Sequence, residues 1–96
     1  MRERLRGKFV RALQTVAHEL EMPGRYEEAI DLYLRGIDAD DLIEPFYQGL
    51  MRSYQHLGRC TEAASAYRRM RQALSVTLGV QPGLASQRLF EELRQR

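Results

Sequence analysis

The sequence predicts an all-α fold in which two helical hairpins stack and a fifth helix caps them. Apolar residues recur at intervals of three and four along most of the chain, which is the spacing of one face of an α-helix. No run of alternating β-branched residues and no Asn-Gly or Asp-Gly turn indicates a strand or a β-hairpin. A six-residue motif also recurs at an offset of 34 residues, so the chain contains an internal repeat.

The first predicted hairpin spans the N-terminal part of the chain. Its first helix carries apolar residues spaced by 4, 4, 3 and 4: Leu5, Phe9, Leu13, Val16 and Leu20. Pro23 and Gly24 end it, because proline cannot extend a helix and glycine accepts the left-handed backbone of a helix end. The second helix carries Tyr26, Ala29, Ile30, Tyr33 and Ile37 and ends in the acidic segment 38–41.

The second predicted hairpin begins near Glu44 and Pro45, since proline is tolerated in a first helical turn. Its first helix ends at Gly58 and carries Tyr47, Leu50, Tyr54 and Leu57. Its second runs from about Cys60 to Gly79 and carries Ala63, Tyr67, Met70, Leu74 and Leu78. A fifth helix follows Pro82 and Gly83 and offers Leu84, Leu89, Phe90 and Leu93. The connections are short, so consecutive helices should be antiparallel.

The repeat gives the most specific information about the fold. The segment 24–29 (GRYEEA) recurs as 58–63 (GRCTEA), and Tyr33 matches Tyr67 at the same offset of 34 residues. This is the period of tetratricopeptide (TPR) repeats. We expect Ala29 and Ala63 to allow close helix packing, and the two tyrosines to fill the space between adjacent pairs. The prediction is a TPR-like α-α superhelix whose fifth helix covers the open apolar end of the stack.

Length and composition are typical of one small globular domain. The 96 residues are 44% hydrophobic and 29% charged, which is too apolar for a disordered segment. The single cysteine excludes an intramolecular disulfide. No apolar stretch is long enough to cross a membrane, and the N-terminus lacks the apolar core of a signal peptide. We expect residues 1–96 to form a single domain in the cytoplasm.

Charge is segregated along the chain although the net charge is only +2. Residues 1–18 carry five basic and one acidic side chain, residues 19–44 carry nine acidic and two basic, and residues 45–96 carry eight basic and three acidic. This pattern favours pairing between neighbouring helices first and a charged partner surface second.

Catalytic and metal sites find little support. His18 and His56 are the only histidines, and neither has an acid–base partner at a suitable spacing. His56 and Cys60 are four residues apart, but Gly58 interrupts the helix between them and no third ligand is evident. We therefore interpret His56 as a surface residue and Cys60 as half-buried. No catalytic, cofactor or metal site is predicted.

Two basic clusters raise the alternative of direct nucleic-acid binding: Arg2, Arg4, Arg6, Lys8 and Arg11, and Arg68, Arg69 and Arg71. Arg4, Lys8 and Arg11 share a helix face, which suits phosphate contacts. No aromatic residue is interleaved there for base stacking, and no helix-turn-helix signature is present. Solvated faces and salt bridges to the acidic second helix are the favoured interpretation.

Protein binding is the preferred function, because the first helices of stacked TPR pairs line a groove. The groove-facing positions would be Arg11, Gln14, His18, Glu21, Gln48, Arg52 and Gln55. Long polar side chains of mixed sign suit a protein surface better than a small-molecule pocket. Gln14, His18 and Gly49 stand where chaperone-binding TPR domains carry a carboxylate clamp, so that clamp is missing.

Several segments resemble the bacterial transcriptional activator domain. They are the tail 78–82 (LGVQP) with Leu89 and Phe90, Glu44 followed by 50–52 (LMR), and Gly58-Arg59, Ala63-Ala64, Tyr67 and Arg71. Gly36 replaces the usual alanine late in the second helix, and Asp41 stands where the TPR consensus has proline.

The resemblance implies a non-catalytic interaction or oligomerisation module of a bacterial transcriptional regulator. In such a regulator the module would follow a separate winged helix-turn-helix domain. Its partners would be another copy, neighbouring domains or the transcription machinery, with DNA bound only through the separate domain. Residues 1–96 would then be a C-terminal part of a larger regulator. The stripe of Leu5, Phe9 and Leu13 would lack part of its cover, which favours self-association. The alternative is a stand-alone TPR adaptor unrelated to transcription.

Overall fold

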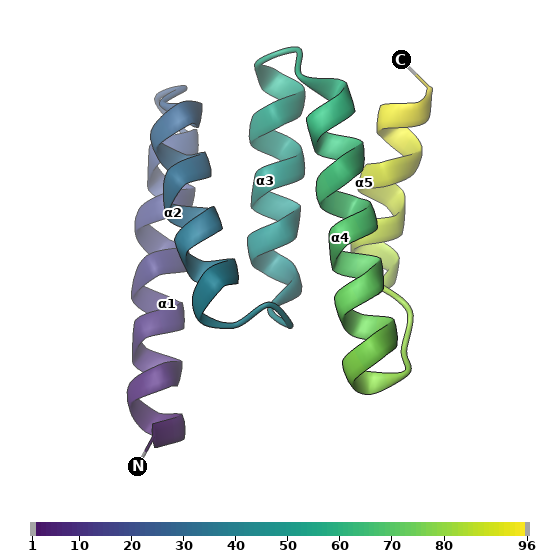
Figure 1. Cartoon of the computed structure of the whole chain (residues 1–96). Coiled ribbons are helices and arrows are strands. Elements are labelled where there is room, and N and C mark those ends of the chain that lie inside the picture. Colours follow the sequence, from purple (N-terminus) through teal and green to yellow (C-terminus); the bar gives the residue numbers. More distant parts are fainter. Residues whose placement is uncertain (1, 96) are drawn as a thin grey trace.

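Five α-helices make up the secondary structure of residues 2–95, the part of the chain that the computed structural model describes, with side chains described for residues 7–95 (Figure 1). They are α1 (Arg2–Glu21), α2 (Tyr26–Ala39), α3 (Glu44–His56), α4 (Cys60–Leu78) and α5 (Leu84–Arg94). No strand occurs within residues 2–95. The predicted all-α, TPR-like fold is confirmed.

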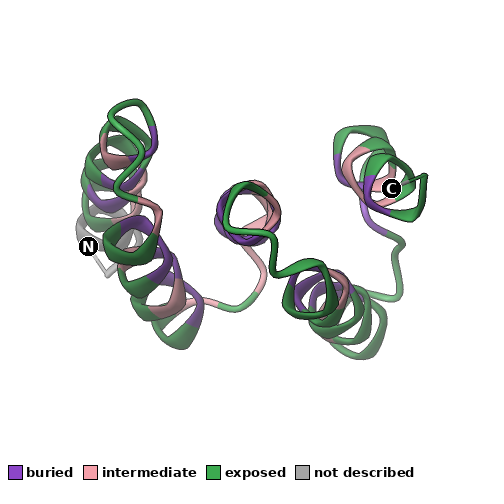
Figure 2. Ribbon diagram, turned by 90° about the horizontal axis from the view of Figure 1, so that it is seen from above, coloured by how far each residue is buried: buried purple, intermediate pink, exposed green. Residues whose placement is uncertain are grey.

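The helices form two layers. Seen from above, α1, α3 and α5 lie on one side of the molecule, and α2 and α4 lie on the other (Figure 2). Within the first layer α3 contacts both α1 and α5, whereas the backbones of α2 and α4 stay apart. The molecule is accordingly thin, 44 × 34 × 18 Å, since a helix with its side chains is about 10 Å across. The predicted groove between the first helices of the two hairpins would therefore lie on the side of the molecule that α1 and α3 form.

Each hairpin turns at a glycine, as the repeat predicts. Gly24 and Gly58 have φ angles of +83° and +74°, which an L side chain rarely adopts. The amide that follows each glycine donates to a carbonyl five residues earlier, from Arg25 to Leu20 (2.9 Å) and from Arg59 to Tyr54 (2.8 Å). The same arginines form ion pairs at equivalent positions of the repeat, Arg25 with Glu28 and Arg59 with Glu62. The two turns are thus built alike.

The repeated alanines and tyrosines lie in the core. Ala29 and Ala63 are fully buried, and Tyr33 and Tyr67 are 1% and 7% exposed. The Tyr33 ring of the first hairpin packs against the Phe46 ring of the second, with 6.3 Å between ring centroids. The predicted packing at the repeat positions is confirmed.

α5 covers the end of the stack. Leu93 is buried, and Leu89 and Phe90 pack against the core. The ring of Phe90 stacks on that of Tyr67 of α4, with centroids 4.2 Å apart and planes 11° apart. The predicted capping role of the fifth helix is confirmed.

The buried face of α1 differs from the predicted stripe. Leu13 and Ala17 are buried and Val10 and Leu20 pack against the core, whereas Phe9 is 47% exposed. Val16 is similarly 48% exposed. The prediction for these two residues is wrong because the apolar arc of α1 is wider than the surface that α2 and α3 cover. The predicted core residue Leu5 lies outside the described side chains.

Other errors in the predicted core lie at helix ends. Leu57, Leu78 and Leu84 are exposed, because each stands at or beyond a helix end, where the neighbouring helices no longer cover it. Cys60, predicted to be half-buried, is exposed at the first residue of α4.

Candidate protein-binding groove between α1 and α3

A pocket of about 260 Å³ lies between α1 and α3. Four of the seven predicted groove residues line it: Gln14 and His18 of α1, and Gln48 and Arg52 of α3. Tyr33 and Pro45 complete the lining. The 34-residue offset relates Gln14 to Gln48 and His18 to Arg52, and the structure places all four side chains at one pocket.

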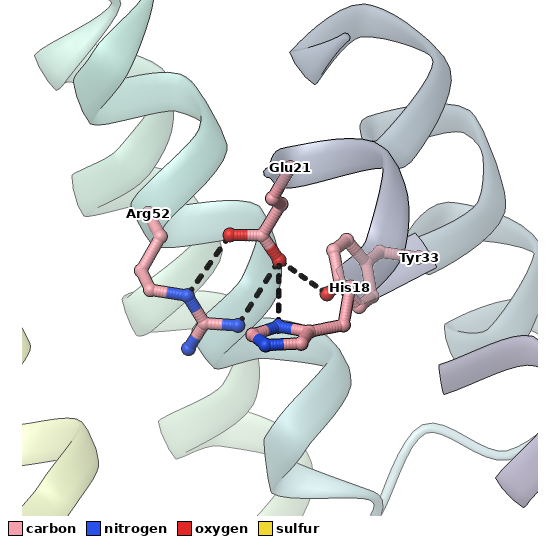
Figure 3. Close-up of polar contacts among 4 residues, drawn as sticks. All are labelled: His18, Glu21, Tyr33 and Arg52. Atoms are coloured by element: carbon pink, nitrogen blue, oxygen red, sulfur yellow. Dashed lines mark hydrogen bonds and ion pairs between the residues drawn. The ribbon is translucent and has the colours of Figure 1, made fainter. Parts of the chain in front are cut away.

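Glu21 does not line this pocket, and its carboxylate lies among the side chains of His18, Tyr33 and Arg52 (Figure 3). Its carboxylate accepts a hydrogen bond from the Tyr33 hydroxyl (2.5 Å) and two from Arg52, through Nε (3.0 Å) and Nη2 (3.1 Å). The residue is only 8% exposed, so the expectation of an open, groove-facing carboxylate is wrong. The reason is its position at the last residue of α1, where α2 and α3 both approach it.

The pKa values of Tyr33 and Arg52 in this cluster are both raised. Burial raises the pKa of Tyr33, and the adjacent Glu21 raises it further, so the phenol stays a proton donor. Burial acts to lower the pKa of Arg52, but the hydrogen bonds and charge of Glu21 outweigh it and raise the pKa overall. The Arg52 and Glu21 charges thus compensate each other.

His18 stands beside this pair at the open side of the groove. Its Nδ1 is 3.8 Å from a Glu21 carboxylate oxygen, and its side chain is 61% exposed. The ring lies next to the guanidinium of Arg52 (Figure 3), so two nitrogen-bearing groups border the pocket together. Both groups can donate hydrogen bonds to a ligand.

A glycine makes room for Tyr33. A Cβ atom on Gly49 of α3 would stand 2.1 Å from Tyr33 Cζ, so a side chain at this position would collide with the ring. A Cβ atom on Gly36 of α2 would likewise stand 2.6 Å from the ring of Phe46. Sequence reasoning missed the role of Gly49, although a glycine inside a helix is a signal of close approach.

A second polar chain links the groove to α5. The Gln48 side-chain amide donates to the Ser86 hydroxyl (2.9 Å), which in turn donates to Glu44 Oε1 (2.9 Å). The same carboxylate oxygen accepts the backbone N–H of Gly83 (2.9 Å), just before α5. Ser86 is fully buried. Sequence reasoning did not predict the contact between Ser86 and Glu44, because nothing in the local pattern marks a partner about 40 residues away.

The two remaining predicted groove residues do not line the pocket. Arg11 is exposed on α1, about one turn before Gln14, and Gln55 is half-buried near the end of α3. They lie on the same two helices beyond the pocket, so a role for either requires a longer ligand.

The other candidate constellations have structural partners. The His56 ring stacks on Tyr26, with centroids 4.6 Å apart and planes 4° apart. Arg69 of α4 pairs with Asp38 of α2 (3.7 Å), which is a predicted pairing between a basic cluster and the acidic second helix. The side chains of Arg2, Arg4 and Arg6 lie outside the described residues.

Within the described part of the chain, no group of three His, Cys, Asp or Glu side chains is placed to hold a metal ion. A membrane-spanning segment is likewise not found among the helices of residues 2–95.

Comparison with known proteins identifies the family. The family model described as bacterial transcriptional activator domain matches residues 1–94, which is nearly the whole chain. Neither the curated proteins nor the solved structures gave a match. The matched region includes all five helices, both repeats and the groove. The chain therefore belongs to the bacterial transcriptional activator domain family.

Proposed function

We propose that the chain is a non-catalytic protein-interaction module of a bacterial transcriptional regulator and that it binds a polypeptide in the groove between α1 and α3. The observation that carries this proposal is the convergence of Gln14, His18, Gln48 and Arg52 on one pocket. Family membership supports the link to transcription.

The chemistry of the groove favours an extended peptide with acidic or carbonyl groups. Gln14 and Gln48 offer amide groups that both donate and accept hydrogen bonds, and Arg52 and His18 offer donors. The Glu21 carboxylate, next to the pocket residues Tyr33 and Arg52, is already paired with Arg52. At about 260 Å³ the pocket is smaller than a typical small-molecule site of roughly 300–1,000 Å³. It suits one or two side chains of a longer partner.

The groove is also rigid. Glu21, Tyr33 and Arg52 join α1, α2 and α3 through three hydrogen bonds, and Gln48 is held by Ser86 of α5. A preorganised surface loses little conformational entropy when a partner binds. This rigidity suits a module in which the binding of a partner in the groove is communicated to the neighbouring domains of the regulator.

Within the proposed regulator, residues 1–96 act as one TPR-like domain that supports, or relays signals to, a separate DNA-binding domain. The partner in the groove is a neighbouring regulator domain or a component of the transcription machinery. DNA is bound only through the separate domain, and the module acts in the cytoplasm, where transcription takes place.

A fusion experiment tests this proposal. The chain is joined to an unrelated bacterial DNA-binding domain, and a reporter gene is placed downstream of the corresponding operator. We expect the fusion to change reporter expression relative to the DNA-binding domain alone. Gln14→Ala combined with His18→Ala should remove most of this change, because both side chains line the pocket and neither belongs to the buried ion pair.

Arg68→Ala is the matched control, since Arg68 is exposed on α4 and does not line the pocket. It should leave the reporter response unchanged. A fusion with no effect on the reporter would favour the alternative of an adaptor unrelated to transcription. An effect that survives the double substitution would instead show that another surface is used.

A further inference from the structure

We propose that a pocket between α4, α5 and the segment that joins them binds a small organic carboxylate. The pocket has a volume of about 540 Å³, compared with about 260 Å³ for the pocket between α1 and α3. It therefore lies within the range of roughly 300–1,000 Å³ that is typical of small-molecule sites. The two pockets share no lining residue, and α4 and α5 lie at the opposite end of the molecule from α1 (Figure 1). This proposal is therefore independent of the proposed function.

Parts of the sequence that the groove between α1 and α3 does not use meet at this pocket. Tyr67 and Arg71 of α4 line it together with Ser75, and their spacing of four residues places the three side chains along one side of the helix. The segment 79–82 forms a second wall, and Gln87 of α5 belongs to a third. Three parts of the chain therefore converge on one site.

Hydrogen bonds hold these walls in place. The Gly79 amide donates to the Ser75 carbonyl (3.0 Å), so the chain turns back directly at the end of α4. The Gln87 side-chain amide donates to the Pro82 carbonyl (2.7 Å), which ties α5 to the joining segment. A pocket whose walls are fixed in this way needs little reorganisation when a ligand binds.

Arg71 gives the pocket its positive charge. It is the only charged residue in the lining. Among the side chains of residues 7–95 no carboxylate forms an ion pair with it, whereas Arg52 of the other pocket is paired with Glu21. A guanidinium presents two parallel N–H donors that match the two oxygens of a carboxylate. Arg71 is therefore available to bind the carboxylate of a ligand.

Neutral groups around Arg71 can bind the rest of the ligand. Gln72 and Gln81 are exposed in the lining and offer amide groups that both donate and accept hydrogen bonds. The hydroxyl of Tyr67 has no hydrogen-bond partner within residues 7–95, and Val80, which is 48% exposed, adds apolar surface. The lining therefore fits a ligand that combines a carboxylate with a polar group and a small apolar part.

The position of the pocket favours one negative charge over two. The pocket holds a single cation and lies at the C-terminal end of α4, where the helix dipole is negative. Phosphate groups favour helix N-termini, where backbone N–H groups point at the ligand. At the N-terminus of α5, Glu44 already accepts the N–H of Gly83 (2.9 Å). A carboxylate therefore fits this site better than a phosphate.

Titration with hippurate tests the site, because this probe joins a carboxylate, an amide and a phenyl ring. In NMR spectra of the isotope-labelled chain we expect saturable shifts of the amide signals of residues 79–81 and of the Arg71 side-chain N–H. The dissociation constant should be on the order of 1 mM for a probe of this size. No saturable shift, or shifts confined to the groove between α1 and α3, would overturn the proposal.

Two analogues of the probe test the ligand class. Hippuramide, with a neutral amide in place of the carboxylate, should bind about tenfold more weakly or worse, because the charge-assisted hydrogen bonds are lost. The corresponding phosphonate, which can carry a second negative charge, should also bind more weakly than hippurate. Equal binding of hippuramide or tighter binding of the phosphonate would overturn the assignment to a carboxylate.

A charge substitution tests the role of Arg71. Arg71→Gln should weaken hippurate binding about tenfold or more, since it removes the cation and keeps a side chain of similar length. Arg88→Gln is the matched control, because Arg88 is exposed on α5 outside the lining and its loss changes the net charge equally. It should leave the dissociation constant unchanged. Equal weakening by both substitutions would mean that hippurate senses only net charge, and the proposal would fall.

A steric substitution tests the pocket itself. Ser75→Leu should block hippurate binding although Arg71 keeps its charge, and leucine is a good helix former, so α4 should stay helical. Thr77→Leu, at an exposed position of α4 outside the lining, should bind hippurate like the wild-type chain. Hippurate binding to the Ser75→Leu variant with wild-type affinity would exclude this pocket as the site.

Discussion

Glu21 is the only charged residue that is buried among the side chains of residues 7–95. A buried carboxylate is costly unless it is paired, and Arg52 and Tyr33 supply that pairing from two other helices. The cluster specifies how the ends of the three helices meet, since its hydrogen bonds form only in this arrangement. Its contribution is testable through Tyr33, whose hydroxyl donates the shortest of these bonds.

Tyr33→Phe should lower the free energy of unfolding by about 2 kcal/mol at pH 7, because a buried hydrogen bond to a charged group is lost. The pKa of Tyr33 is raised in the folded state by burial and by Glu21. Its stabilising effect is therefore fully present below the unfolded-state pKa of about 10 and decreases as the pH rises above that value. Urea unfolding of both proteins at pH 7 and pH 11 measures this. An unchanged difference at pH 11 would contradict it.

Gly49→Ala should destabilise the fold by about 2 kcal/mol. The new Cβ would stand 2.1 Å from the Tyr33 ring, and this overpacking outweighs the roughly 1 kcal/mol gain in helix propensity. Gly7→Ala is the matched control, since the nearest atom to its Cβ would be Arg11 Nη1 at 3.8 Å. It should stabilise α1 by up to about 1 kcal/mol. Equal effects of the two substitutions in urea unfolding would be inconsistent with this explanation.

Among the elements, α5 is the least extensively packed. Its contacts with α3 and α4 are smaller than those between consecutive helices from α1 to α4. Its N-terminal end is fixed by polar contacts, in which Glu44 of α3 accepts hydrogen bonds from Ser86 and from the Gly83 backbone. A carboxylate near a helix N-terminus is also stabilised by the helix dipole.

Ser86→Ala should therefore loosen α5 more than the rest of the molecule. It removes the buried hydroxyl between Gln48 and Glu44. Native-state hydrogen exchange should become faster along α5, while the slowest amides of α3 change much less. Ser65→Ala, at an exposed position of α4, should leave both helices unchanged. Equal acceleration in α3 and α5 would show that Ser86 supports the whole fold instead.

Helical periodicity located all five elements but not every buried face. α3 packs against the other four helices, so it buries Phe46 and Met51 as well as the predicted Tyr47, Leu50 and Tyr54. α1 packs against α2 and α3 only and leaves Phe9 and Val16 exposed. How much of an amphipathic helix is buried depends on the number of its neighbours, which its own sequence does not specify.

For the whole molecule, the contact between the two hairpins is as extensive as the contacts within them. α2 packs against α3 about as closely as against α1, and Phe46 of α3 is fully buried against the first hairpin near Tyr33 and Gly36. The repeats therefore share one core. We therefore expect them to unfold together and not as two independently stable units.

Phe46→Ala should accordingly destabilise both hairpins together, by about 3–4 kcal/mol. The wild-type chain should unfold in urea in one transition, with the same midpoint for amide signals in α1 and in α4. The variant should keep a single transition at a lower urea concentration. Separate midpoints for the two helices, in either protein, would show that the hairpins unfold independently.

The sequence by itself determined the five helices, the glycine turns, the 34-residue repeat and the alanines and tyrosines at its core, because helix periodicity and turn chemistry act over a few residues. It also identified four residues that meet in the groove, since a repeat carries positions from one helix to the next. Only the tertiary structure decided that Glu21 is buried, that the absence of a side chain at Gly49 makes room for Tyr33, that Ser86 links α5 to α3 and that Phe9 and Val16 of α1 stay exposed. These features depend on contacts between helices that are far apart in the sequence. Such contacts determine which side chains are buried and which polar groups are paired.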